Sequence, residues 1–270
     1  TDGGGSVRIP AAFTGVFGFK ATFGRVPVFP PSAMGTLSHV GPLTRTVEDA
    51  AMIMNIITQP DSRDWSALPH DSLDYRTGLD LGMRNLSIAF SPNLGYAKVA
   101  PEVASIVADA VKVLEAQGAV IDEVDPDFDD PKEIFSAHWD LGAARLVEKV
   151  PQERRIEMDP GLLRIAERGW KLTLAQHADA VDARVELGHK MNLFHETYDL
   201  LVTPAMPIPA FTAGQDLADQ DSQNDWMDWS PFTYPFNLTG QPACVVPCGF
   251  TALGLPVGLQ IVGARYADPL

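Results

Sequence analysis

The sequence predicts an α/β fold, an α/β/α sandwich in which helices flank a large mixed, partly parallel sheet. Three observations predict it. A strand, a helix and a second strand follow one another within 86–125, a long helical region fills 131–200, and an apolar strand pair closes the chain. The 270 residues, 46% of them hydrophobic, contain no internal repeat and no low-complexity linker. We therefore expect a single domain.

The first strong helical pattern covers residues 46–58. Thr46 is the expected N-cap, and Asp49 stands three residues later in a variant of the capping box. The apolar residues that follow are dense enough for a buried helix, and Pro60 ends it.

A strand–helix–strand unit follows. LSIAFS (86–91) and AVIDEVD (119–125) are typical strands, and residues 101–118 between them carry a single apolar helical face. Pro101 is suited to the start of that helix and Gly118 to its end. Such a unit predicts two parallel strands joined by a right-handed crossover.

The second half begins with helices and ends with strands. Residues 131–200 are predicted to be mostly helical, and DLLVTPAMPIP (199–209) is typical of a buried strand running into a proline-rich loop. Residues 216–229 are acidic and polar, which predicts a surface loop. ACVVPCGF (243–250) and PVGLQIVGARY (256–266), joined by the turn-rich TALGLP, are expected to pair as a hairpin.

The composition limits the kinds of molecule that the protein is expected to bind. The net charge of −15 argues against nucleic acid and against anionic membranes, and no apolar run is long enough to span a bilayer. Cys244 and Cys248, the only cysteines, are expected to be small buried hydrophobic residues, so neither a metal nor a cofactor is expected. Low cysteine usage fits the cytoplasm, but a chain that begins without methionine leaves the question of a signal peptide open.

The chain opens with TDGGGSVRIPAAF, and the glycines before Ser6 fit none of the common glycine motifs. No lysine precedes Ser6 as a phosphate-binding loop requires, and Val7, Arg8 and Ile9 stand where the dinucleotide and nucleophile-elbow motifs need small residues. What remains is a serine directly behind unshielded amides, with a helix expected to begin at Pro10. Such a loop is suited to hold an oxyanion, and the alternative is a flexible turn.

Three stretches resemble the amidase signature family, the Ser–cisSer–Lys hydrolases. TDGGGSVRIPAAFTGVFGFKATFGRVP (1–27) is similar to the family's signature segment at nearly every position. LSHVGPLTRTVEDAA (37–51) and PFTYPFNLTGQPACVVPCGFTALGLPVGLQIVGARYAD (231–268) continue the likeness, while residues 85–200 match only in general plan.

The resemblance implies the amidase signature fold, truncated at its N-terminus, as one domain over 1–270. The signature segment and nucleophile loop would occupy 1–60, a variable α/β region 85–200, and the C-terminal strands of the core sheet 200–270. Ser6 would be the acyl-forming nucleophile. The oxyanion hole would consist of the backbone amides of Gly3, Gly4, Gly5 and Ser6.

The resemblance also assigns supporting roles. Asp2 and Arg8 correspond to residues that fix the loop, and a lesser interpretation of Arg8 is a contact with a substrate carboxylate. Lys20 matches a structural lysine. The family's base is a neutral lysine acting through a cis-serine, and both lie upstream of the segment that begins this sequence. His39 is the nearest histidine, but nothing in the spacing places it beside Ser6.

Two consequences follow. We expect residues 1–270 alone to be inactive or severely impaired as an amidohydrolase. We also expect apolar surface left without its cover to favour self-association into a homo-oligomer.

The resemblance implies a small-molecule amide as substrate. Ile9 stands where the A subunit of the tRNA-dependent amidotransferase has glutamine, and LSHVGP stands where it has LDQIGP, so a stand-alone amidohydrolase is favoured. The acidic charge agrees with this preference. The alternatives that remain are the amidotransferase protein itself and a non-catalytic amidase-like scaffold. Four aromatic residues either line an acyl pocket or pack beneath the sheet: Trp229, Phe232, Tyr234 and Phe236.

Overall fold

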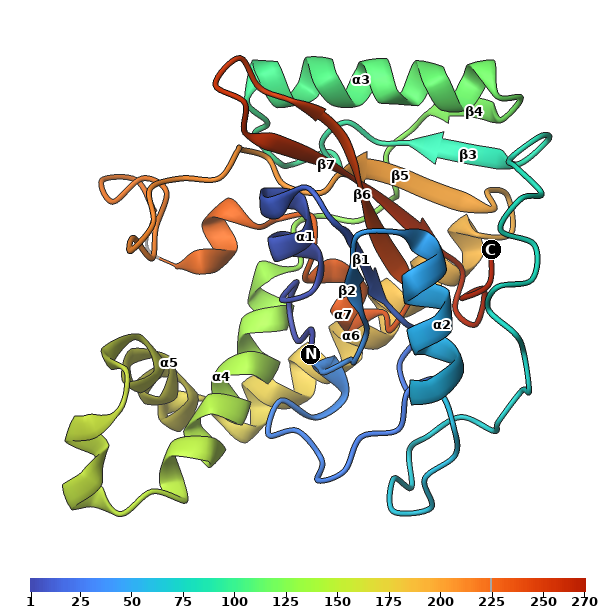
Figure 1. Ribbon diagram of the computed structural model, residues 1–270. Helices are drawn as coiled ribbons and strands as arrows, with labels where there is room; N and C mark the ends of the chain where they lie inside the picture. Colours follow the sequence, from blue (N-terminus) through green and yellow to red (C-terminus); the bar gives the residue numbers. More distant parts are fainter. Residues whose placement is uncertain (224) are drawn as a thin grey trace.

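The computed structural model describes residues 1–223 and 225–270 (Figure 1). In chain order the elements are α1 (Arg8–Thr14), β1 (Phe17–Lys20), η1 (Gly35–Leu37), β2 (Leu43–Thr44), α2 (Val47–Ile57), β3 (Ser87–Phe90), α3 (Pro101–Ala116), β4 (Val120–Glu123), α4 (Lys132–Glu148), η2 (Gln152–Glu157), α5 (Pro160–Lys171), α6 (Leu174–Phe194), β5 (Leu200–Pro204), η3 (Trp226–Trp229), α7 (Pro235–Leu238), β6 (Ala243–Phe250) and β7 (Pro256–Gly263).

The strands form one seven-stranded sheet in the order β2-β1-β6-β7-β5-β3-β4. β3 pairs in parallel with β4 and with β5, and the other neighbours are antiparallel. The parallel unit around α3 and the closing β6–β7 hairpin confirm two of the sequence predictions. The α/β class with a mixed sheet is therefore confirmed.

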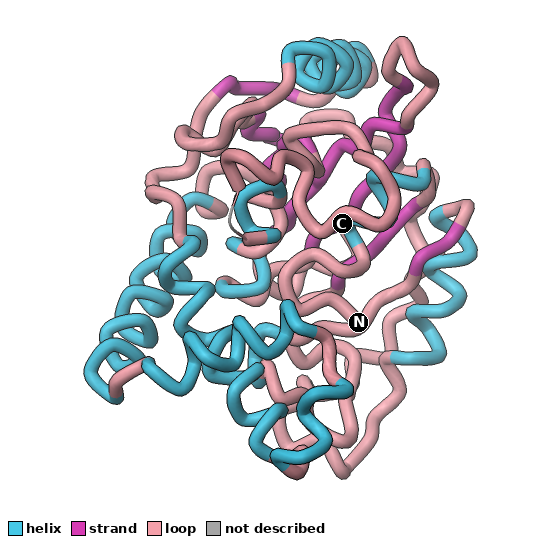
Figure 2. The backbone as a smooth tube through the Cα atoms, turned by 90° about the vertical axis from the view of Figure 1, so that its left-hand side faces the viewer, coloured by secondary structure: helices cyan, strands magenta, loops and turns pink. Residues whose placement is uncertain are grey.

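On one face, α3 covers the strands. Val103, Val107 and Val111 of this helix form a buried cluster with Ile88 of β3 and Leu259 of β7. These three valines recur every four residues, which places them on one side of the helix. Figures 1 and 2 both show α3 lying across the top of the sheet.

On the opposite face, α1 lies very close to the strands. A Cβ atom on Gly18 of β1 would stand 2.7 Å from the Cβ of Ala11, and one on Gly258 of β7 would stand 2.8 Å from the Cβ of Ala12. Glycine in the strands and alanine in the helix are therefore needed for this contact. α6 and α7 cover more of the same face through Met191 and neighbouring apolar residues.

The predicted helix starts are mostly right. The Thr46 hydroxyl accepts a hydrogen bond from the Asp49 amide at the start of α2, as predicted. α1, in contrast, begins at Arg8 and not at Pro10, because the chain is already helical at Val7. Proline is tolerated in this first turn, where amide groups have no partner within the helix.

The structure also answers the questions of a membrane-spanning helix, a metal-binding group and the state of the two cysteines within the described residues. Among the described residues, no helix is long and apolar enough to cross a membrane, and no group of three or more His, Cys, Asp or Glu side chains could hold a metal ion. Cys244 and Cys248 on β6 are free thiols, and burial raises their pKa values to about 12 and about 11.

Candidate active site

The glycine loop is held at its first residues by pairing with a distant segment. The amide of Asp2 donates to the carbonyl of His39, and the amide of His39 donates to the carbonyl of Asp2, both at 2.8 Å. After the glycines, the Ile9 amide donates to the carbonyl of Gly5 at 2.7 Å, which leads the chain into α1. The loop is therefore tied at both ends.

The Asp2 carboxylate organises the loop from inside. It accepts from the amides of Gly5 (2.8 Å) and Val7 (3.2 Å), and it forms a buried ion pair with Arg8 at 2.9 Å. Burial by itself raises the pKa of Asp2, but the charge and hydrogen bonds of Arg8 outweigh it, so that the pKa lies well below its usual value. The carboxylate is thus a fixed anion around which the loop turns.

Arg8 is completely buried and every contact it makes is internal. Besides its two bonds to Asp2, it donates to the carbonyl of Thr233 (2.8 Å), to Gln260 Oε1 (2.9 Å) and to Asn237 Oδ1 (2.6 Å). These contacts contradict the interpretation of Arg8 as a ligand for a substrate carboxylate, because its guanidinium has no free surface. They agree with its expected role in fixing the loop.

One of the four backbone amides expected to form the oxyanion hole already donates a hydrogen bond within the loop. The Gly5 amide is directed at Asp2 Oδ1, and Gly5 has a φ of 136°, in the region that favours glycine. The Gly5 amide is thus not available to an oxyanion in this structure, which corrects the expectation. Among the described residues, the amides of Gly3, Gly4 and Ser6 have no hydrogen-bond acceptor.

Close packing explains why these positions are glycine. A Cβ atom on Gly3 would lie 2.8 Å from Trp139 Cζ3, and one on Gly4 would lie 2.6 Å from Trp226 Cη2. Any side chain here would displace the indole rings. Glycine at these two positions therefore lets the loop lie against the aromatic side chains.

Ser6 itself is exposed, whereas its neighbours Gly5 and Val7 are buried. Within residues 1–223 and 225–270 its hydroxyl has no hydrogen-bond partner, so no general base of the described chain contacts it. Lys20 is buried, donates through Nζ to the carbonyl of Gln241, and has its pKa lowered by burial and by the charge of Arg8. His39 is buried with Nδ1 2.8 Å from the carbonyl of Leu37.

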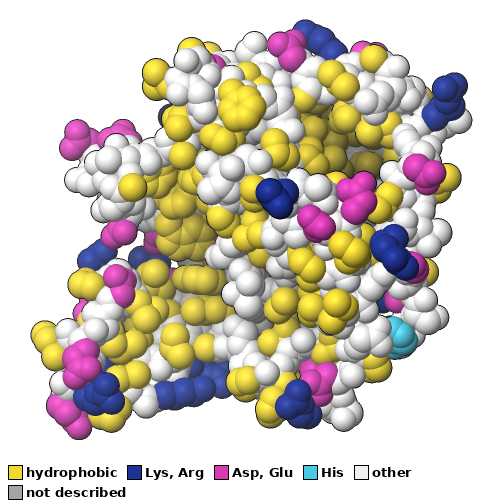
Figure 3. Space-filling view, viewed as in Figure 1, with side chains coloured by type: hydrophobic (Ala, Val, Ile, Leu, Met, Phe, Trp, Pro, Cys, Tyr) yellow, Lys and Arg dark blue, Asp and Glu magenta, His cyan; other side chains and the backbone are white. Residues whose placement is uncertain are grey.

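A cavity of about 1070 Å³ adjoins the loop. Ile9, Trp139 and Trp226 line it, and a Cβ atom on Gly5, Gly3 or Gly4 would lie 2.6–2.8 Å from these three side chains in turn. Figure 3 shows a hollow with mostly hydrophobic walls between the main body and the projecting α4–α5 region. The glycine loop therefore packs against side chains that line the cavity.

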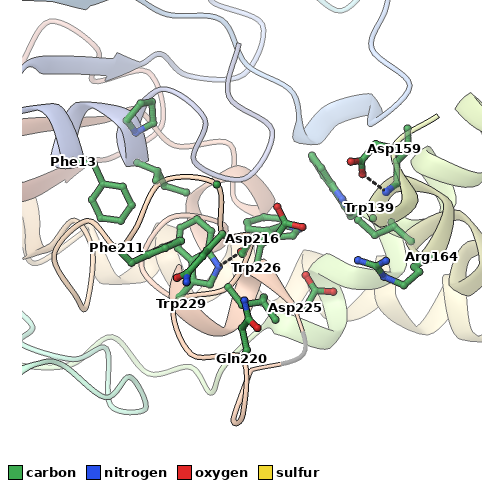
Figure 4. Close-up of a pocket in the computed structure, with 18 of the residues that line it drawn as sticks. Phe13, Trp139, Asp159, Arg164, Phe211, Asp216, Gln220, Asp225, Trp226 and Trp229 are labelled. Atoms are coloured by element: carbon green, nitrogen blue, oxygen red, sulfur yellow. Dashed lines mark hydrogen bonds between the residues drawn. The ribbon is translucent and has the colours of Figure 1, made fainter. Parts of the chain in front are cut away.

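The cavity has an aromatic side and a charged side (Figure 4). Phe13, Phe211 and Trp229 contact one another with ring centroids 5.2–6.3 Å apart. On the other side, Arg168 bridges Asp140 and Asp225, each at 2.8 Å. The aromatic side is suited to an apolar ring or chain, and the charged side is already neutralised in part by this bridge.

The four aromatic residues singled out from the sequence separate into two groups. Trp229 lines the cavity. None of the other three has exposed surface: Phe232 and Phe236 pack against residues of the sheet, and Tyr234 packs with residues of α4 and α6. For these three, the expected pocket role is contradicted and the alternative of a packed core holds.

Sequence reasoning missed the polar residues behind the loop. The side-chain amide of Asn237 donates to Asp2 and to the carbonyl of Leu37, and Thr233 Oγ1 donates to the carbonyl of Gly4 at 2.6 Å. Gln260 on β7 completes the set through Arg8. The one available signal was a few polar residues within the otherwise apolar stretches PFTYPFNLTG and PVGLQIVG.

The family of the protein follows from comparison of the whole chain. The family model described as Amidase matches residues 1–270, so the chain belongs to the amidase signature family of amidohydrolases. Among curated relatives, the chain is 35% identical to an acylamidase of Rhodococcus erythropolis and 33% identical to the A subunit of the glutamyl-tRNA(Gln) amidotransferase of Myxococcus xanthus. It covers 58% and 60% of their lengths, while 100% and 99% of the chain is aligned.

Solved structures give the same result. A bacterial aryl acylamidase of the amidase signature family superposes with a TM-score of 0.86 at 30% identity, covering 99% of this chain and 58% of that one. 6-Aminohexanoate cyclic dimer hydrolase, in complex with its substrate, superposes with a TM-score of 0.84 at 25% identity, covering 99% and 61%. The chain thus spans about three fifths of the length of the proteins it resembles.

Proposed function

We propose that the protein hydrolyses carboxylic amides through an acyl-enzyme on Ser6. The observation that carries the proposal is an exposed serine hydroxyl beside backbone amides of Gly3 and Gly4 that have no hydrogen-bond acceptor among the described residues, in a loop that adjoins an apolar cavity. A hydroxyl in this position can reach a carbonyl carbon, and amides without an acceptor can donate to the oxygen of that carbonyl.

The proposed reaction has two steps. Ser6 Oγ bonds to the carbonyl carbon while its proton passes to a general base, and the oxyanion is bound by the amides of Gly3, Gly4 and Ser6. The C–N bond then breaks and the nitrogen leaves as an amine or as ammonia after receiving a proton. Water next attacks the acyl-enzyme, which releases a carboxylic acid and restores Ser6. Each oxyanion donor is expected to contribute roughly 100- to 1000-fold to the rate.

The general base that takes the Ser6 proton is expected to lie outside residues 1–270. The family resemblance supplies it as a lysine acting through a cis-serine, and neither Lys20 nor His39 contacts the Ser6 hydroxyl. We therefore expect residues 1–270 alone to be inactive, and a longer polypeptide that contains the upstream pair to be active.

We further propose an apolar, aromatic or acyl, group on the substrate. The contacts among Phe13, Phe211 and Trp229 support it, as does Ile9 on the cavity wall in the position where the amidotransferase protein has glutamine. The acylamidase relatives are consistent with this preference. A Trp229→Ala variant should lose about tenfold in selectivity for an anilide over a small primary amide.

The test is amine and ammonia release from a panel of anilides and primary amides, comparing the longer polypeptide with its Ser6→Ala variant. Activity that Ser6→Ala abolishes supports the proposal, and activity that survives Ser6→Ala refutes it. If nothing in the panel is hydrolysed, labelling by a fluorophosphonate decides between the remaining alternatives. A labelled Ser6 indicates an activated serine with another substrate, and an unlabelled one indicates a non-catalytic scaffold.

The A subunit of the tRNA-dependent amidotransferase remains the second candidate, because the chain is 33% identical to one such protein. Its signature would be glutamine-dependent ammonia release that requires partner proteins. Hydrolysis of anilides by the isolated polypeptide would favour the stand-alone enzyme.

A further inference from the structure

A second cavity, of about 710 Å³, is unusual in its charge. It lies among α4, α6, α7 and the segment after β7, and its basic lining residues are Arg184, Arg265, His138 and His189. Among the described residues that line it there is no aspartate or glutamate. The whole chain carries 35 acidic against 20 basic residues, so this is a local excess of positive charge in an acidic protein. We call it the Arg184–Arg265 cavity.

Arg184 is held in place by neutral groups alone. Its Nε donates to the carbonyl of Leu238 at 2.7 Å, and its Nη1 and Nη2 donate to the hydroxyl and carbonyl of Thr36 at 2.7 and 3.3 Å. A guanidinium has five N–H donors, so two of them remain after these bonds. Burial, followed by the positive charge of Arg265, lowers the pKa of Arg184 to about 10.

Arg265 stands at the mouth of the cavity on the segment after β7. Its guanidinium lies 4.9 Å from the ring centre of Tyr266 and donates to that phenol at 2.7 Å. Within the part of the chain that the structure describes, neither Arg184 nor Arg265 forms a salt bridge. The two guanidinium groups thus repel each other, and neither is paired with a carboxylate of the described residues.

His138 on α4 adds a polar atom without a partner. Its Nε2 is buried and forms no hydrogen bond, and its ring stands edge-on to that of His177 at 5.3 Å. Burial and the charges of Arg184 and His177 lower the pKa of His138 to about 4. The surroundings therefore hold this imidazole neutral for as long as no negative charge is present.

We propose that the Arg184–Arg265 cavity binds an anion that carries a carboxylate or phosphate group. Such a group would offset the repulsion between the two guanidiniums and accept from the free donors of Arg184, since the planar guanidinium matches the geometry of both anions. The same charge would also favour protonation of His138. This site is separate from the cavity beside Ser6, so it does not depend on the proposed function.

The test is isothermal titration and thermal unfolding with inorganic phosphate and with succinate, at constant ionic strength set by chloride. Either anion should raise the melting temperature in proportion to the logarithm of its concentration. Arg265→Gln should weaken binding about tenfold or more, because a charge-assisted hydrogen bond is lost. Arg145→Gln, at an exposed arginine on α4, is the matched control and should leave binding unchanged.

The anion series identifies the ligand chemistry. Preference for phosphate indicates a phosphorylated ligand, preference for succinate indicates a carboxylate, and equal binding of both indicates recognition by charge; each supports the site. Arg184→Lys, which retains the charge but loses the planar fork, should also weaken binding. The proposal is overturned if neither anion binds at millimolar concentration, or if wild type, Arg265→Gln and Arg145→Gln bind equally.

Discussion

Replacing Arg8 by methionine tests whether the buried pair with Asp2 holds the glycine loop that contains Ser6. Both side chains are 0% exposed, and Arg8 makes five hydrogen bonds that methionine cannot make. Removing one partner of a buried pair leaves an uncompensated charge and costs about 3–5 kcal/mol. For a chain of this size, that loss corresponds to a fall of roughly 10 °C in melting temperature.

The assay is urea and thermal unfolding, followed by circular dichroism, of wild type, Arg8→Met and an Arg145→Met control. The wild-type Asp2 pKa is lowered below its usual 3.8, so the stability from this group is complete above that pH and lost as the pH falls through the folded value. In Arg8→Met the Asp2 carboxylate keeps its bonds from the Gly5 and Val7 amides but loses the charge of Arg8, so its pKa should rise above the wild-type value and the stability gap between variant and wild type should narrow in acid. A loss below about 1 kcal/mol at pH 7 would refute this reasoning.

Three further variants test packing and titration. Gly4→Ala should lower the free energy of unfolding by about 1–3 kcal/mol and reduce activity, because the new methyl would lie 2.6 Å from Trp226 Cη2. Gly188→Ala on α6, where a Cβ atom would meet nothing within 4 Å, should instead raise the free energy of unfolding by about 1 kcal/mol. If chemical denaturation gave the same change in the free energy of unfolding for both glycine variants, the steric argument would be contradicted. The His138 pKa of about 4 lies below its ordinary 6.5, so wild-type stability should decline as the pH falls from 6.5 to 4, and His138→Gln should lessen that decline. Identical pH profiles of melting temperature for wild type and His138→Gln would show that folding does not lower the pKa of His138.

The sequence by itself determined the features that depend on neighbouring residues. The Thr46 cap, the unit formed by β3, α3 and β4, and the closing hairpin follow from local spacing, and the structure confirms them. The glycine run before Ser6 and its likeness to a known signature identified the family before any geometry was available. These predictions succeed because helix periodicity, capping and short turns are set within a few residues.

Only the tertiary structure decided which groups at the site are free. The Gly5 amide is occupied by Asp2, and Arg8 is enclosed by Asn237 and Gln260, which follow it by 229 and 252 residues. The spacing of letters along the chain carries no information on contacts at that separation.

The same holds for the aromatic residues after Trp226. Trp229 faces the cavity and Tyr234, five positions later, is fully buried, although both are large rings in one short segment. Irregular segments have no fixed period that assigns side chains to one face, so which rings are buried depends on the elements packed against them.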